Sequence, residues 1–65
     1  MTECELWACA ETLRQRYGSD ASVRASMRVD AMLADGDAAG RAVWITILER
    51  VRRLEAVRLE HEPLH

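Results

Sequence analysis

The sequence predicts an all-α protein, folded as a small antiparallel three-helix bundle. Gly18 and Gly36 divide the 65 residues into three segments, and a glycine directly after a helix is a common stop signal. Within each segment hydrophobic residues recur every three or four positions, whereas no long run alternates as a strand would. The expected organisation is a single domain over residues 1–60, with helices at about 3–17, 20–34 and 38–60 and a frayed tail at 61–65.

The first helix begins with a capping box, in which the Thr2 hydroxyl accepts from the backbone of Glu5 and the Glu5 carboxylate accepts from the backbone of Thr2. Its hydrophobic residues share one narrow face. They are Leu6, Cys9, Ala10, Leu13 and Tyr17. Trp7 lies at the margin of this face, which makes it a candidate for an exposed apolar patch.

The second helix is expected to be capped by Ser19 or Asp20 and to end before Gly36. It has two apolar faces on nearly opposite sides. One face holds Val23, Met27, Ala31 and Ala34, and the other holds Ala25, Val29, Met32 and Leu33. Either one wide arc packs against both neighbouring helices, or one face contacts a second subunit.

The third helix starts after Asp37, its expected cap. Its apolar stripe ends at Leu54, after which charged residues follow and Pro63 stops the helix. The stripe comprises Gly40, Val43, Trp44, Ile47, Leu48, Val51 and Leu54. Because the linkers hold only a few residues, consecutive helices are expected to be antiparallel neighbours.

No residue pattern indicates an enzyme, a metal site, a cofactor or a small-molecule substrate. Cys4 and Cys9 point about 140° apart on a helix, and with His61 and His65 they lack the spacing of a zinc site. We expect Cys9 to be a small core residue. Two unpaired thiols suit a reducing compartment, and no signal peptide or membrane-spanning run is found, so we expect a cytoplasmic protein.

Nucleic-acid binding is the alternative function, as a small DNA-binding regulator of phage or toxin–antitoxin type. All nine basic residues are arginine, and the candidate contacts in the third helix are Arg50, Arg52 and Arg53. These arginines are interleaved with glutamates and the net charge is −2, whereas DNA binding requires uncompensated positive charge on one face. A solvated helix surface is the simpler interpretation.

The favoured function is a non-enzymatic protein–protein interaction or regulatory module that acts through helical apolar surfaces. A chain this short rarely builds a core worth more than a few kcal/mol, so we expect a homodimer or a complex with another protein. The candidate interface residues are Trp7, Val29, Met32, Leu33 and Ile45. We expect Trp44, by contrast, to lie in the core.

The chain resembles a family of short bacterial proteins of unknown function. The residues that carry the resemblance are the opening Glu5–Ala10 (E-L-W-A-C-A), the Arg28–Asp30 triplet, Gly36-Asp37 with Gly40, and Trp44 with Ile47. That family occurs mainly in alphaproteobacteria. The resemblance spans about residues 3–54 and excludes the C-terminal tail. It implies a stand-alone cytosolic domain with the two tryptophans as signature positions, and it brings no activity, substrate or cofactor.

Overall fold

The computed structural model describes the backbone of residues 2–61 and the side chains of residues 2–57, and this part of the chain is all-helical. Helix α1 (Glu3–Tyr17), the 3₁₀ turn η1 (Gly18–Asp20) and α2 (Ala21–Ala34) follow one another without a gap, and α3 (Ala38–His61) comes after a short turn. The all-α class is therefore confirmed. Of the predicted frayed tail, His61 is the last residue of α3, and 62–65 lie outside the described residues.

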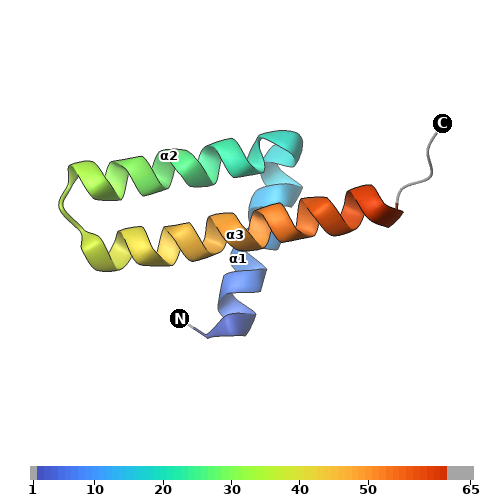
Figure 1. Ribbon diagram of the computed structural model, residues 1–65, viewed down its shortest axis with the longest axis horizontal. Coiled ribbons are helices and arrows are strands. Elements are labelled where there is room, and N and C mark those ends of the chain that lie inside the picture. The colour runs from blue at the N-terminus through green and yellow to red at the C-terminus, as the bar shows by residue number, and fades with distance from the viewer. Residues whose placement is uncertain (1, 62–65) are drawn as a thin grey trace.

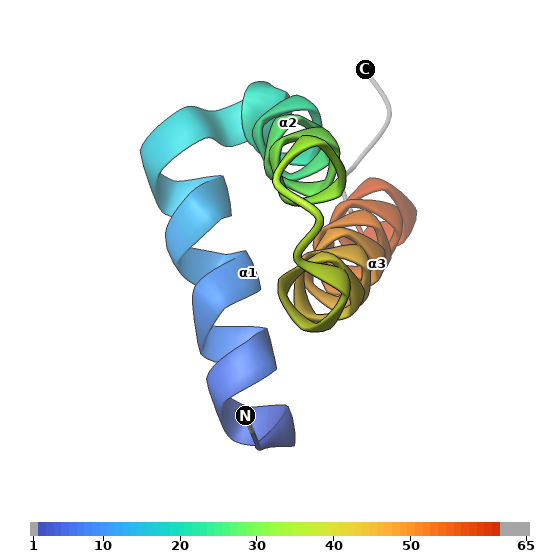
Figure 2. The same cartoon turned by 90° about the vertical axis from the view of Figure 1, so that its left-hand side faces the viewer.

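The helices are not arranged as the expected bundle. Helices α2 and α3 lie side by side and run in opposite directions, whereas α1 crosses them steeply, as two perpendicular views show (Figures 1 and 2). The antiparallel order thus holds for α2 and α3 only. The reason lies in η1, which continues the helical path from α1 into α2 and bends it, where we expected an open linker that turns back.

The residues around η1 explain the bend. Thr2 and Glu5 form the predicted capping box at the start of α1. Gly18 has a φ of 57°, a region that residues with a Cβ rarely adopt. The expected side-chain cap of α2 by Ser19 or Asp20 is wrong: Asp20 precedes α2 without a side-chain cap, and the amide of Ala21 donates to the Gly18 carbonyl instead. The start of α2 is therefore held by a backbone hydrogen bond and not by a side-chain cap.

The turn between α2 and α3 follows the predicted chemistry. The amide of Gly36 donates to the Leu33 carbonyl and that of Asp37 to the Met32 carbonyl, the pair of bonds that defines a Schellman motif. The Asp37 carboxylate then accepts from the amide of Gly40 at 2.8 Å, which caps α3 as expected. A Cβ at Gly40 would lie 2.5 Å from the Asp37 Oδ2 and 2.8 Å from the Met32 sulfur, so this glycine leaves room for the capping carboxylate and the Met32 side chain.

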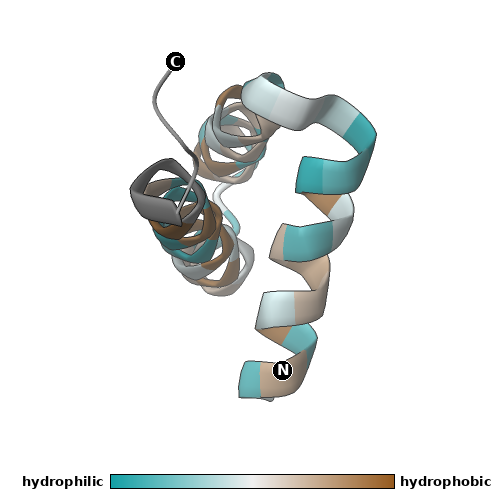
Figure 3. Ribbon diagram, turned by 90° about the vertical axis from the view of Figure 1, so that its right-hand side faces the viewer, coloured by the Kyte–Doolittle hydropathy of each residue, from teal (hydrophilic) through white to brown (hydrophobic). Residues whose placement is uncertain are grey.

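The core is small and rich in alanine. Within residues 2–57 its buried residues are Leu6, Ala10, Ala21, Ala25, Ile47 and Val51. Most of the predicted stripes of α1 and α3 pack against this core, with Cys9, Leu13, Val43, Trp44 and Leu54 partly buried around it. On α1 the hydrophobic residues alternate with hydrophilic ones turn by turn (Figure 3).

Two expectations about hydrophobic faces need correction. Tyr17, which the sequence places on the hydrophobic face of the first helix, is 37% exposed, because α1 ends where the chain bends away. Helix α2 buries Ala25 and half-buries Val29 and Met32, but its other apolar face is open, with Val23 and Met27 both 56% exposed. Since α1 crosses α3 and meets α2 only at the start of α2 (Figure 1), none of the described helices covers that face.

Candidate functional site

The residues predicted to form one interface are spread over the molecule. Val29, Met32 and Ile45 are half-buried, whereas Leu33 is 62% exposed. Met32 and Leu33 line a shallow hollow at the turn between α2 and α3, with a volume of about 180 Å³. Trp7 lies elsewhere, against Leu54 of α3. The five side chains therefore do not share a surface.

Arg50, one of the predicted nucleic-acid contacts, is bound within the protein. Its guanidinium donates to the Glu3 carboxylate at 2.6 and 3.3 Å and lies 5.2 Å from the ring centre of Trp7. The Arg50 side chain is 17% exposed and that of Glu3 63%. The hydrogen bond from Arg50, reinforced by the positive charges of Arg50 and Arg53, lowers the pKa of Glu3 below its ordinary value of 4.5. This cluster joins α1 to α3.

The Glu3–Arg50 pair predicts a pH dependence of stability. Because the folded pKa of Glu3 is lowered, its contribution is complete above the unfolded pKa of 4.5 and is lost as pH falls through the lower folded pKa. When the pH is lowered from about 5 to about 3, the melting temperature of Glu3→Gln should therefore fall less than that of the wild type. Glu11→Gln, which changes an exposed carboxylate of the same helix, is the control. Equal acid-induced losses in all three proteins would contradict the role of the pair.

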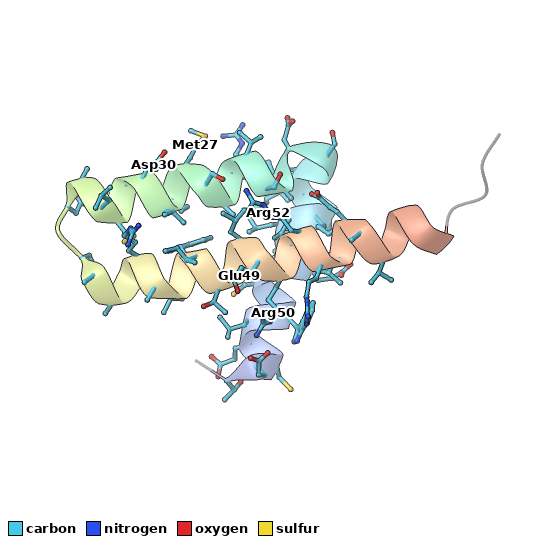
Figure 4. The ribbon with its side chains drawn as sticks, viewed as in Figure 1. Met27, Asp30, Glu49, Arg50 and Arg52 are labelled. Atoms are coloured by element: carbon cyan, nitrogen blue, oxygen red, sulfur yellow. The ribbon has the colours of Figure 1, made fainter. Side chains whose placement is uncertain are left out.

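Arg52 and Arg53 are exposed but do not extend the Arg50 cluster into a basic face. Arg50 and Arg52 point to opposite sides of α3, with Arg50 directed toward the start of α1 (Figure 4). Arg53 borders an apolar hollow instead. The three arginines predicted to contact nucleic acid thus do not form one surface.

A groove appears where α1, α2 and α3 meet, and we call it the basic groove. Its volume is about 480 Å³. Its apolar lining includes Tyr17, Met27 and Trp44, and its charged lining is Arg16, Arg24 and Arg28, with no acidic residue. The remaining lining residues are Thr12, Leu13 and Ala31. The groove exists because α1 crosses α3 and reaches α2 only at the start of α2, instead of packing along α2 (Figures 1 and 2).

Two arginines of the basic groove are held against aromatic rings. The Arg24 guanidinium lies 4.8 Å from the ring centre of Tyr17, and that of Arg28 lies 5.7 Å from the ring of Trp44. Such cation–π contacts fix the guanidinium over a ring face while its N–H groups stay available at the edge. This site was not predicted from the sequence, although Arg24, Met27, Arg28 and Ala31 share one face of α2 at helical spacing.

A second apolar surface, the end patch, lies where α1 begins and α3 approaches its end. It consists of Trp7, Arg53, Leu54, Ala56 and Val57, and encloses about 320 Å³. Val57 is 51% exposed. This part of α3 projects beyond α2 (Figure 1). Arg53 is the one charged side chain among the patch residues.

The remaining chemistry-bearing residues form no cluster. Among the described residues, no three histidine, cysteine, aspartate or glutamate side chains come together as metal ligands. Cys4 is an exposed free thiol and Cys9 a half-buried one. Glu55 is half-buried, and its Oε1 accepts no hydrogen bond from any described side chain. None of the helices over 3–61 is long and apolar enough to cross a bilayer.

Comparisons with protein-family models, curated proteins and solved structures find no match to this chain. The resemblance to a family of short alphaproteobacterial proteins therefore stays a prediction.

Proposed function

We propose that this protein is a non-enzymatic protein–protein interaction module and that it forms a homodimer. The observation that supports this is the imbalance between core and surface. Of the six residues that are buried within residues 2–57, three are alanines, while Tyr17, Val23, Met27, Leu33 and Val57 are between 37% and 62% exposed. A core of this size contributes only a few kcal/mol net, and exposed hydrophobic surface commonly marks an interface.

We assign the dimer contact to the end patch. In a two-fold dimer the same surface of both copies meets itself. The basic groove would then face three arginines with three arginines, and like charges brought together across an interface cost several kcal/mol. The end patch carries one arginine beside Trp7, Leu54 and Val57, and tryptophan is a frequent interface anchor.

The dimer is tested by sedimentation velocity over a range of protein concentrations. We expect wild type to sediment as a dimer and Val57→Asp as a monomer, because an aspartate in the end patch would lose its water on association. Val23→Asp is the matched control: it makes the same change at a helical valine of similar exposure, 56% against 51%. A monomeric wild type at high micromolar concentration, or equal dissociation of both variants, would overturn the dimer.

We also propose that the protein works in the cytoplasm, where free thiols persist in a reducing environment. Cys4, an exposed free thiol, supports this. The alternative of DNA binding through Arg50, Arg52 and Arg53 has less support, since Arg50 is bound to Glu3.

A further inference from the structure

We propose that the basic groove binds an acidic segment of a partner protein, in which a leucine-like side chain fills the apolar floor and flanking carboxylates pair with the arginines. This inference rests on the interaction role proposed above but uses a different surface. An experiment can therefore disprove self-association at the end patch without disproving peptide binding in the groove, and the reverse.

Charge distribution is the first argument for an acidic occupant. Three of the nine arginines line the basic groove, where no acidic residue accompanies them. The other six share the rest of the chain with eleven acidic residues. An overall acidic protein thus brings three arginines together at one hollow, and charge complementarity at such a surface sets partner choice and association rate.

The geometry of the arginines is the second argument. Arg24 and Arg28 lie one helical turn apart on α2, and each is stacked on an aromatic ring from another helix. Arginines positioned in this way lose less conformational entropy when they bind a carboxylate. Their N–H groups can donate paired hydrogen bonds to carboxylate oxygens, which are stronger than hydrogen bonds between neutral groups.

The groove's apolar lining is the third argument, because it requires a partner with a hydrophobic anchor. Leu13 and Trp44, both partly buried, form the apolar floor from α1 and α3, and the exposed Met27 adds to the lining from α2. A volume of about 480 Å³ falls in the range of sites that enclose a bound group. Met27 and Asp30 point from α2 away from α3 (Figure 4), and Asp30 is not among the lining residues.

A nucleic acid is the competing polyanion, since bases also stack on aromatic rings. The protein's net charge of −2 opposes it, because a long polyanion responds to the whole charge of its partner. A short acidic peptide responds mainly to the groove. The observations therefore favour the peptide, and an oligonucleotide belongs in the test.

The test measures fluorescence anisotropy of a short fluorescein-labelled peptide of alternating glutamate and leucine, titrated with full-length protein. We expect saturable binding that weakens when salt is added. Peptides with glutamine in place of glutamate, or serine in place of leucine, should each bind at least about tenfold more weakly. The same titration with the monomeric Val57→Asp variant separates groove binding from dimerisation, because the end patch is then altered and the groove intact.

Charge reversal locates the site. Arg24→Glu with Arg28→Glu should weaken peptide binding by at least about tenfold. Arg41→Glu with Arg52→Glu is the matched control, since it makes the same net change at two exposed arginines outside both the groove and the end patch, and should change binding by less than about threefold. Met27→Ser keeps every charge, changes an exposed residue, and should also weaken binding. Circular dichroism verifies that each variant is folded.

Three results would overturn the proposal. The first is no binding of the acidic peptide by wild type. The second is equal weakening by the two double substitutions, which would indicate attraction to the whole surface. The third is tighter binding of a labelled oligothymidylate than of the peptide, lost in the Arg24→Glu/Arg28→Glu variant, which would make the groove a nucleic-acid site.

Discussion

Ile47→Ala should leave the protein largely unfolded at room temperature. Ile47 is 2% exposed and belongs to the cluster in which Leu6 and Ala10 of α1 meet Val51 of α3. Removing the isoleucine side chain from such a position costs about 2–5 kcal/mol. A single core this small contributes about 3–5 kcal/mol at most, so the loss is comparable to the whole stability of the folded chain.

Urea denaturation followed by circular dichroism measures this effect. Ile47→Val, which removes one methyl group and keeps the β-branched shape, should cost about 0.5–1.5 kcal/mol and remain folded. All variants need the same protein concentration, because self-association adds stability by mass action. A cooperative transition of Ile47→Ala close to that of wild type would mean that the stability resides elsewhere, for example in the dimer contact.

The ends of the helices could be predicted from the sequence because their signals are local. Thr2 and Glu5 satisfy each other's backbone groups within one turn, and Gly36 and Asp37 close α2 and open α3 with hydrogen bonds that span a few residues. Short-range chemistry of this kind leaves few alternatives. The buried residues of α3 could also be predicted from the sequence, since the helical period places Ile47 and Val51 on one face.

The direction of α1 could not be predicted, because it depends on contacts between distant residues. Gly18 looked like the end of a helix before an open linker, and that pattern does not reveal that Gly18–Asp20 continues as a 3₁₀ turn. Which side of α2 becomes buried follows from this bend. Two apolar faces were recognised, yet Ala21 and Ala25 rather than Val23 and Met27 are buried.

The candidate site was missed for the same reason. The basic groove combines Tyr17 of α1, Arg24 and Arg28 of α2, and Trp44 of α3, and only the crossing of α1 brings these side chains together. Trp44 packs against the core cluster and also lines the groove. The groove is therefore a consequence of the helix arrangement, and changing that arrangement should change binding.

Ala10→Leu should displace α1 and weaken peptide binding, although Ala10 does not line the groove. Ala10 is fully buried in the cluster with Ile47 and Val51, so a larger side chain has to push the helices apart. Overpacking of this kind typically costs about 1–3 kcal/mol. Leucine is nearly as good a helix former as alanine, so α1 itself should stay helical and the loss should come from its contact with α3.

Ala8→Leu is the matched control, because it makes the same substitution at an exposed position of the same helix. We expect Ala10→Leu to lower the melting temperature and to weaken binding of the glutamate–leucine peptide, and Ala8→Leu to change neither. Melting temperature reports the packing of α1 against the core, and peptide binding reports the groove. A folded Ala10→Leu variant that binds the peptide like wild type would show that the groove survives displacement of α1. Weakened binding in both variants would instead implicate the outer surface of α1 in the contact with the partner.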